Sequence, residues 1–89
     1  MARLMNVGFG NVVNTDKVVA VISAASSPAK RMLQSSREQG FLIDATQGRK
    51  TKSLILTDGS YVISSALLPE TLMIRFNTDM SETGSEIDE

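Results

Sequence analysis

The sequence predicts an α+β fold in which a small antiparallel sheet packs on one main helix, with a second, short helix near the C-terminus. Three observations support this. Short apolar runs rich in β-branched residues recur along the chain, as in strands. One segment with helical spacing lies between a proline and a glycine. The 89 residues allow one small domain with a marginal core, which self-association would stabilise.

The first strands are expected in the N-terminal quarter of the chain. Residues 4–9 form an apolar strand that ends in the Gly-Phe-Gly-Asn turn at 8–11, and Val12 and Val13 begin a return strand. A polar turn over residues 14–17 follows. The next strand, residues 18–23, is apolar on both faces, so we place it in the centre of the sheet or under a helix.

The main helix is expected to begin with Ser27 as its N-cap and Pro28 at the first helical position. Gly40 is placed to end it. The residues that recur at i, i+3, i+4 and i+7 and should form its buried stripe are Ala29, Met32, Leu33 and Ser36. A second set at helical spacing forms a cationic flank and consists of Lys30, Gln34 and Arg37.

The second half of the chain is expected to contain a short strand at 41–43 and then a polar, basic loop at 44–52. Asp44 follows an apolar strand end, where an Asx residue usually caps its own loop. Strands 53–57 and 60–64 flank an Asp-Gly pair, which predicts a hairpin with a two-residue type I′ turn.

The last helix is expected to begin at Pro69, with Leu72, Met73 and Phe76 packed inward. Apolar periodicity is lost from Asn77 onward, so we expect a domain over residues 1–77 and an acidic, disordered tail over residues 78–89. The charges divide at the same place. The first 76 residues carry nine basic and five acidic side chains, a net charge of +4, whereas the last 13 carry five acidic and no basic ones.

Several classes of function are excluded by composition. The chain has no cysteine and no histidine, which removes disulfides, thiolate and imidazole metal sites, and His-dependent triads. No apolar run is long enough to span a membrane, and the lack of cysteine fits the reducing cytoplasm. We therefore expect a cytoplasmic protein without a metal, a cofactor or a membrane contact.

Two motifs that resemble enzyme signatures have simpler explanations. Ser27 and Lys30 match the Ser-x-x-Lys acylation motif, but a chain of 89 residues cannot enclose that active site, and a helix cap accounts for the serine. The Gly-Phe-Gly-Asn run at 8–11 lacks the third glycine of a nucleotide fingerprint and is better explained as a backbone turn. The sequence therefore does not predict an enzyme.

The basic residues give the strongest functional signal. Arg49, Lys50 and Lys52 crowd together beside a glycine, and Lys30 and Arg31 lie near a helix start, where cations are unfavourable unless an anion also binds. The chain has only four aromatic residues, most of them expected in the core, which favours contact with double-stranded DNA phosphates over base stacking. One subunit that neutralised about three phosphates would have a salt slope of only about −2.7, so a closed homo-oligomer is expected to supply avidity.

Four runs of the sequence, at residues 6–13, 26–31, 43–52 and 69–71, together resemble the RemA family of bacterial regulators of extracellular-matrix genes. The resemblance covers about residues 4–76. It implies a cytoplasmic protein that assembles into a ring, wraps or bends promoter DNA, and activates biofilm-matrix and osmoprotection genes.

The resemblance also implies the residues that contact DNA. The matching positions are Lys17, Arg49 and Lys50, and this chain has lysine at 17 and 50 where the family usually has arginine. Lysine keeps the attraction to phosphate but lacks the bidentate geometry of arginine. Lys52, Lys30 and Arg31 are the weaker candidates. The acidic tail is not part of the family pattern, and our hypothesis is that it competes with phosphate for the basic loop.

Two alternatives remain open at this point. The protein could be an oligomeric adaptor whose basic loop binds an acidic protein partner, without DNA binding. It could also be a sensor of a small anion or nucleotide, bound at the helix start between Ser27 and Lys30.

Overall fold

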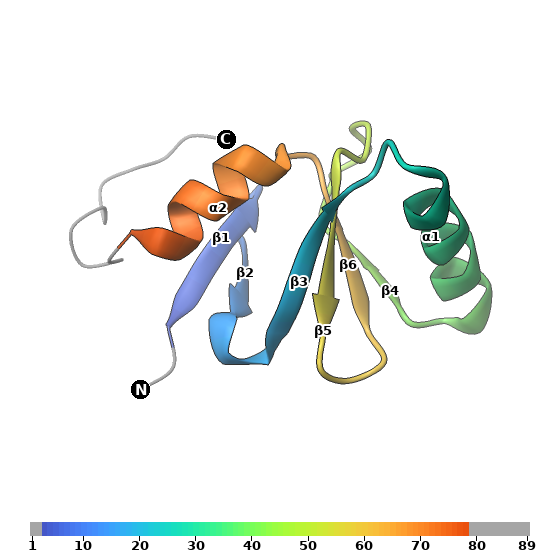
Figure 1. The fold of residues 1–89 in the computed structure, drawn as a ribbon, viewed down its shortest axis with the longest axis horizontal. Helices are drawn as coiled ribbons and strands as arrows, with labels where there is room; N and C mark the ends of the chain where they lie inside the picture. Colours follow the sequence, from blue (N-terminus) through green and yellow to red (C-terminus); the bar gives the residue numbers. More distant parts are fainter. Residues whose placement is uncertain (1–2, 79–89) are drawn as a thin grey trace.

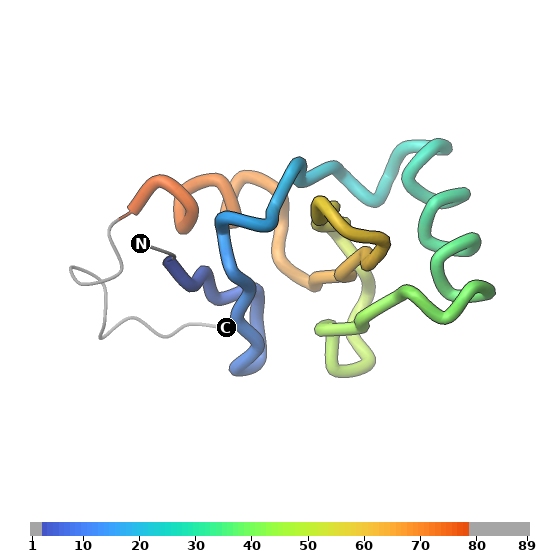
Figure 2. The backbone as a smooth tube through the Cα atoms, turned by 90° about the horizontal axis from the view of Figure 1, so that it is seen from below, coloured from blue at the N-terminus to red at the C-terminus, as the bar shows by residue number. Residues whose placement is uncertain are grey.

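The computed structural model describes residues 3–78, which form three layers (Figures 1 and 2). A four-stranded sheet lies in the middle, one helix covers one face, and a β-hairpin with a second helix covers the other. The elements in chain order are β1 (Leu4–Gly8), β2 (Asn11–Asn14), the 3-10 helix η1 (Thr15–Lys17), β3 (Val18–Ser23), α1 (Ser27–Gln39), β4 (Leu42–Asp44), β5 (Ser53–Thr57), β6 (Val62–Ser65) and α2 (Pro69–Asn77). The predicted α+β class is confirmed, whereas the predicted tail lies outside the described residues except for Thr78.

The prediction of an antiparallel sheet is wrong for one strand. The strand order is β3-β5-β6-β4, and β4 pairs with β6 in parallel, so this sheet is mixed. The chain leaves β4 through the basic loop, returns along β5 and turns again into β6, and β6 therefore runs in the direction of β4. β1 and β2 form a separate antiparallel pair.

Of the two places predicted for the strand at 18–23, the centre of the sheet is wrong, whereas the position under a helix is right, because β3 contacts α2. β3 is an edge strand that pairs only with β5, and its ladder shifts register between Val18 and Ala20. This bulge turns Val19 outward, with 67% of its surface exposed. β5 takes the central position instead, because Leu54 and Ile55 point to opposite faces and are both fully buried.

Two apolar clusters hold the layers together. On one face of the sheet, Leu54 and Val62 pack with Ala29 of α1. On the other face, Ile55 and Ile63 pack with residues of β1 and α2. The alternation of side chains along β5 and β6 thus decides which layer each residue joins.

The main helix has the predicted buried stripe, but its N-cap lies one residue earlier than predicted. The Oγ atom of Ser26, rather than that of Ser27, accepts a hydrogen bond from the Ala29 N–H at 3.2 Å. Ser26 has the extended backbone that a cap requires, whereas Ser27 is already helical. Gly40 ends the helix in the left-handed conformation, as predicted.

The β5–β6 hairpin is present, but its predicted two-residue turn is wrong. The last paired residues are Leu56 and Val62, and Gly59 does not have the positive φ that a type I′ turn requires. The connection is longer because the Asp58 backbone does not pair with β6. Its N–H donates instead to the Lys17 carbonyl at 2.9 Å.

The predicted inward packing of α2 is right only for Leu72. Leu72 is fully buried, whereas Met73 and Phe76 are 58% and 42% exposed, since α2 lies at the side of the edge strand β3. Phe76 and Tyr61 are both exposed, so the expectation that most aromatic residues lie in the core is also wrong. Within residues 3–78, no helix is long and apolar enough to cross a membrane.

Candidate nucleic-acid interface

Three segments that are distant in sequence meet at one end of the four-stranded sheet, where β3, β4 and β6 end and β5 begins. At this end, the Lys52 N–H donates to the Ser65 carbonyl at 2.8 Å, and the Ala24 N–H donates to the Lys52 carbonyl at 3.0 Å. The Ser65 hydroxyl donates to the Val7 carbonyl at 2.8 Å, which brings in the end of β1. The end of the basic loop, residues 50–52, therefore lies beside the segment that leads into α1, and both are at the top of the molecule in Figure 1. We call the cations gathered here the cationic edge, and they are Lys30, Arg49, Lys50 and Lys52.

Asp44 builds the loop that carries three of these cations. Its Oδ1 atom accepts hydrogen bonds from the Thr46 hydroxyl at 2.6 Å, the Thr46 N–H at 2.9 Å and the Ser64 hydroxyl at 3.1 Å. The two hydrogen bonds from Thr46 hold the pKa of the Asp44 carboxyl below its usual range. The predicted capping role of Asp44 is therefore confirmed.

The loop then makes a tight turn before its cations. Gln47 and Gly48 both have positive φ, of 55° and 80°, and the Arg49 N–H donates to the Thr46 carbonyl at 2.9 Å. These contacts fix the backbone of the loop directly before Arg49, Lys50 and Lys52.

Lys30, Lys50 and Lys52 line one open groove of about 670 Å³. The small residues 23–25 also line it, and Glu70 is the one acidic residue in its lining. Among residues 3–78, none of the three lysines has an ion-pair partner. α1 begins beside them and adds the positive end of its helix dipole. Its first turn contains no acidic residue that would neutralise this charge. The groove is therefore an electropositive surface.

Arg49 does not line this groove and contacts Phe9 instead. Its Cζ atom lies 5.4 Å from the centroid of the Phe9 ring, in the turn between β1 and β2. Sequence reasoning explained the run at 8–11 as a backbone turn and missed this contact. The available signal was an aromatic residue between two glycines.

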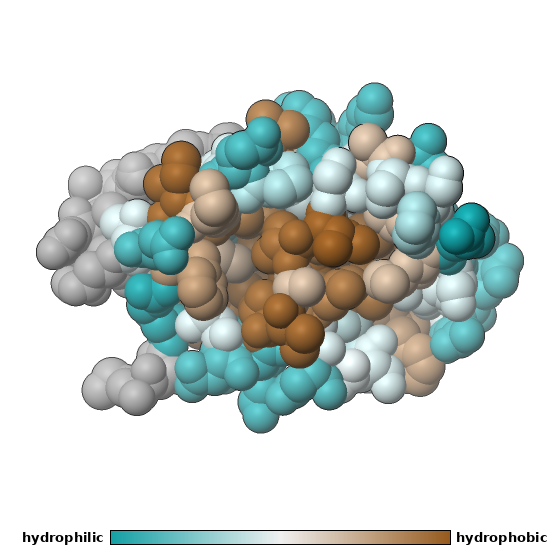
Figure 3. Space-filling view, viewed as in Figure 1, coloured by the Kyte–Doolittle hydropathy of each residue, from teal (hydrophilic) through white to brown (hydrophobic). Residues whose placement is uncertain are grey.

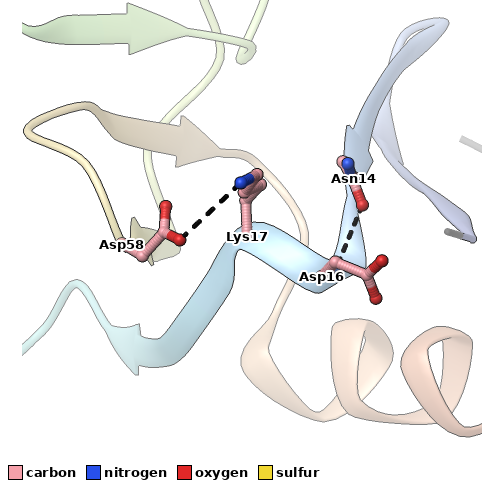
Figure 4. Close-up of polar contacts among 4 residues, drawn as sticks. All are labelled: Asn14, Asp16, Lys17 and Asp58. Carbon is pink, nitrogen blue, oxygen red and sulfur yellow. Dashed lines mark hydrogen bonds and ion pairs between the residues drawn. The ribbon is translucent and has the colours of Figure 1, made fainter.

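The structure does not bring Lys17 to the other candidates. Lys17 lies at the end of η1, where its Nζ atom is 4.0 Å from Asp58 Oδ2, as drawn in Figure 4. The five residues of β5 separate this end of the sheet from Lys52, a distance of about 17 Å at 3.4 Å per residue. Arg31 follows Lys30 on α1 and is exposed, but it does not line the groove.

Within the described part of the chain, no three acidic, histidine or cysteine side chains come together to hold a metal ion. The groove with the lysines is an open surface rather than an enclosed cleft. The fold and this edge define a small α+β protein whose surface suits an anionic partner.

The chain belongs to the RemA-like family, described as extracellular matrix regulatory protein A-like, whose family model matches residues 4–76. A relative from Natranaerobius thermophilus is 47% identical over 85 residues and covers 96% of each chain. One from Acetivibrio thermocellus is 48% identical over 80 residues, with 90% of this chain and 86% of the relative covered. One from Clostridium acetobutylicum is 46% identical over 89 residues, with 98% and 97% covered.

These findings confirm the resemblance inferred from the four sequence runs. The three relatives all carry the name "Putative regulatory protein". The names of the family and of its members thus place the chain with regulatory proteins.

Proposed function

We propose that this protein is a transcriptional regulator that binds double-stranded DNA through the cationic edge and assembles into a closed, ring-shaped homo-oligomer. The observation that carries the proposal is the groove in which Lys30, Lys50 and Lys52 converge from two separate segments. Phosphate is the ligand class that such a groove suits, because several point charges can neutralise a phosphodiester without any catalytic partner. Promoter DNA of biofilm-matrix and osmoprotection genes is the target that the family resemblance supports.

Assembly supplies what one subunit lacks. The cations of a single groove neutralise only a few phosphates, which gives weak binding that salt readily reverses. A ring repeats the groove, so later contacts become intramolecular and the overall affinity rises without new chemistry. In such a ring, DNA that follows the rim is bent by contacts with successive subunits.

An apolar surface supports the proposed self-association. Val19, Met73 and Ile74 are each more than half exposed, and β3 leaves one side of its ladder unpaired. A groove of about 420 Å³ runs between β3 and α2, and Figure 3 shows apolar residues gathered in the middle of this view. An exposed apolar edge strand favours association unless it is covered, and a second copy of the chain is the partner that we propose covers it.

Lys17 contributes separately from Arg49 and Lys50 in this proposal. Its ion pair with Asp58 is exposed and long, so it is worth little and yields easily to a phosphate. Because Lys17 lies at the opposite end of β5, it contacts a different phosphate from the one held by Lys50.

DNA binding is tested with the double variant Arg49→Ala, Lys50→Ala in a mobility-shift assay on duplex fragments. We expect it to require a much higher protein concentration than the wild type at the same salt, for all sequences alike. The control is Arg37→Ala, which removes a cation near the opposite end of α1. A double variant that shifts DNA at the wild-type concentration and salt would show that the assigned surface is wrong.

The adaptor and anion-sensor alternatives give different results. A wild-type protein that ignores duplex DNA at moderate salt, yet binds an acidic protein, would indicate an adaptor. Heat released on calorimetric titration with free nucleotides would indicate a sensor, whereas the proposal expects no heat at millimolar nucleotide.

A further inference from the structure

The turn between β1 and β2 lies against the basic loop. Val7 is tied to β6 by the Ser65 hydroxyl, and a Cβ atom added to Gly8 would lie 3.7 Å from Leu67. These contacts fix the base of the turn beside the loop. At its tip, the Phe9 ring faces the Arg49 guanidinium, whose Cζ atom is 5.4 Å from the ring centroid.

The β1–β2 turn has a phenylalanine at a position where the backbone favours glycine or asparagine. Gly8, Phe9 and Gly10 have φ values of 114°, 55° and 80°, so three consecutive residues lie on the positive side. Two glycines adopt this conformation at little cost, but a phenylalanine does so only when its surroundings hold it there. The Asn6 side chain accepts from the Gly8 N–H at 2.7 Å, and the Asn11 side chain donates to the Gly8 carbonyl at 3.0 Å. The sequence thus holds Phe9 in a strained conformation.

Core packing does not account for this strain. Phe9 is half-buried and belongs to neither apolar cluster. The ring contact that the structure gives it is the one with Arg49. The two-residue turn requires positive φ at Phe9 and Gly10, but asparagine, aspartate or glycine is the usual residue at the first position, so the turn does not explain why that residue is a phenylalanine.

The contact leaves the binding capacity of Arg49 intact. A ring that attracts a guanidinium takes up its planar face, whereas the five N–H donors lie in the plane and point outward. Arg49 has no ion-pair partner among the described residues, and the Phe9 ring is the side chain that the structure places against its guanidinium. A guanidinium restricted beforehand loses less entropy when it binds a phosphate or a base edge.

We propose that Phe9 is a positioning residue of the nucleic-acid interface: its ring aims Arg49, and the turn at 8–11 forms the second wall of the interface. This inference rests on the proposed function. Lys30, Lys50 and Lys52 line the groove on one side of the loop, and Arg49 and Phe9 form the other side. The loop is therefore a ridge with cations on both flanks.

A double-mutant cycle tests the proposal in the full-length protein. Phe9→Leu keeps apolar volume but removes the aromatic face, and we expect it to weaken duplex binding by about two- to fivefold for each subunit in contact with DNA. Phe9→Tyr keeps the aromatic ring and should therefore bind duplex DNA with the affinity of the wild type. In an Arg49→Ala background, Phe9→Leu should have no further effect. Phe41→Leu is the matched control, because Phe41 is half-buried too but packs edge-on against Tyr61, with ring centroids 5.7 Å apart.

A second readout needs no DNA. The δ protons of Arg49 should show an upfield ring-current shift in the NMR spectrum of the free protein, and Phe9→Leu should abolish it. If the wild type fails to bind duplex DNA while this shift is present, the proposed function is wrong and the aiming of Arg49 by Phe9 stands. If the variant does not fold, Phe9→Met replaces it in both measurements.

Three results would overturn the proposal. The first is a Phe9→Leu protein that binds DNA as tightly as the wild type. The second is an equal loss on Phe9→Leu in the wild-type and Arg49→Ala backgrounds, which would show that Phe9 acts without Arg49. The third is an Arg49 spectrum that Phe9→Leu leaves unchanged.

Discussion

Asp44 is the residue that determines the shape of the basic loop. One carboxylate oxygen accepts three hydrogen bonds, from two donors of Thr46 and from Ser64, and both of these residues are almost fully buried. The loop that carries Arg49, Lys50 and Lys52 begins directly after this anchor. A change at Asp44 should therefore affect stability and DNA binding together.

Asp44→Ala leaves the Thr46 N–H and the Ser64 hydroxyl without their acceptor. We expect it to lower the free energy of unfolding by about 1–3 kcal/mol, measured by urea unfolding at neutral pH. Asp16→Ala is the control, because Asp16 is an exposed carboxylate in η1, and it should change stability little. Equal effects of the two changes would contradict the anchoring role.

The same contribution should depend on pH. Hydrogen bonds from Thr46 lower the pKa of Asp44 in the folded state below its ordinary value of 3.8. A depressed folded-state pKa means that the stabilisation is complete above the unfolded-state pKa and is lost as the pH falls through the folded-state pKa. The stability difference between the wild type and Asp44→Ala should therefore be constant above about pH 5 and shrink toward pH 2. A difference that does not change over that range would be inconsistent with this cause.

At this scale, the sequence predicted local roles better than distant contacts. An Asx residue after a strand end acts within two residues, so the role of Asp44 could be predicted from its neighbours. The contact of Phe9 with Arg49 depends on how the hairpin packs on β6, and no local pattern contains that information. Lys17 was grouped with the loop cations by family resemblance, and only the strand register shows that β5 separates them.

The elements begin and end where particular caps and backbone angles allow them. Two neighbouring serines lie at the start of α1. Ser26 is the N-cap, and its hydroxyl accepts the hydrogen bond from the Ala29 N–H, whereas Ser27 is the first helical residue. The amino-acid sequence could not show which serine is the N-cap, because both have the same side chain. The backbone conformation distinguishes them, and the stability effect of replacing each serine can be measured.

Ser26→Ala should lower stability by about 1 kcal/mol, because it removes the acceptor of a helix N-terminal N–H. Ser27→Ala should be close to neutral, since Ser27 is the first helical residue. The two melting temperatures provide the comparison. A larger effect at Ser27 would place the cap where the sequence alone suggested it.

Two glycines in loops should respond in opposite ways to alanine. Both have open space where the Cβ atom would be, but only Gly48 has a positive φ, of 80°. Gly48→Ala should cost about 1 kcal/mol through backbone strain. Gly59→Ala should be neutral or slightly stabilising, because the unfolded chain loses entropy. A comparable loss at Gly59 in urea unfolding would indicate the type I′ turn that the structure does not show.

The arrangement of strands was only partly predictable at this scale. Leu54, Ile55 and Leu56 alternate between the two apolar clusters, which is the period-two pattern expected of a strand. β4 has only three residues, and such a short strand carries no signal for the direction of its pairing. The composition of β3 fits a central strand, but the same apolar residues also fit an edge that another chain covers.

The molecule carries two neighbouring surfaces with different chemistry, and Pro69 and Glu70 at the start of α2 line both of their grooves. The cationic edge lies where the basic loop meets α1, and the apolar surface lies on β3 and α2. Such a division is what an assembly needs if one surface holds the copies together and the other faces the ligand. A charged residue introduced on the apolar surface should therefore lower the mass of the assembly in solution without unfolding the subunit.

Val19→Lys places a charge on the apolar surface between β3 and α2. We expect the mass in solution to fall toward that of the monomer, measured by light scattering at micromolar concentration, because a buried, unpaired lysine opposes association. Gln39→Lys is the control, since it adds the same charge at the far end of α1. An unchanged mass for Val19→Lys would place the contact between copies elsewhere.

The central claim is that the cationic edge binds DNA phosphates, and the salt dependence of duplex affinity tests it most directly. The wild type, Lys50→Gln and Arg37→Gln are compared as the logarithm of affinity against the logarithm of salt concentration. Lys50→Gln should flatten the slope by about 0.9 for each phosphate contact that it removes, equally for unrelated sequences, while Arg37→Gln should keep the wild-type slope. A Lys50→Gln protein with the wild-type slope and affinity would contradict the account.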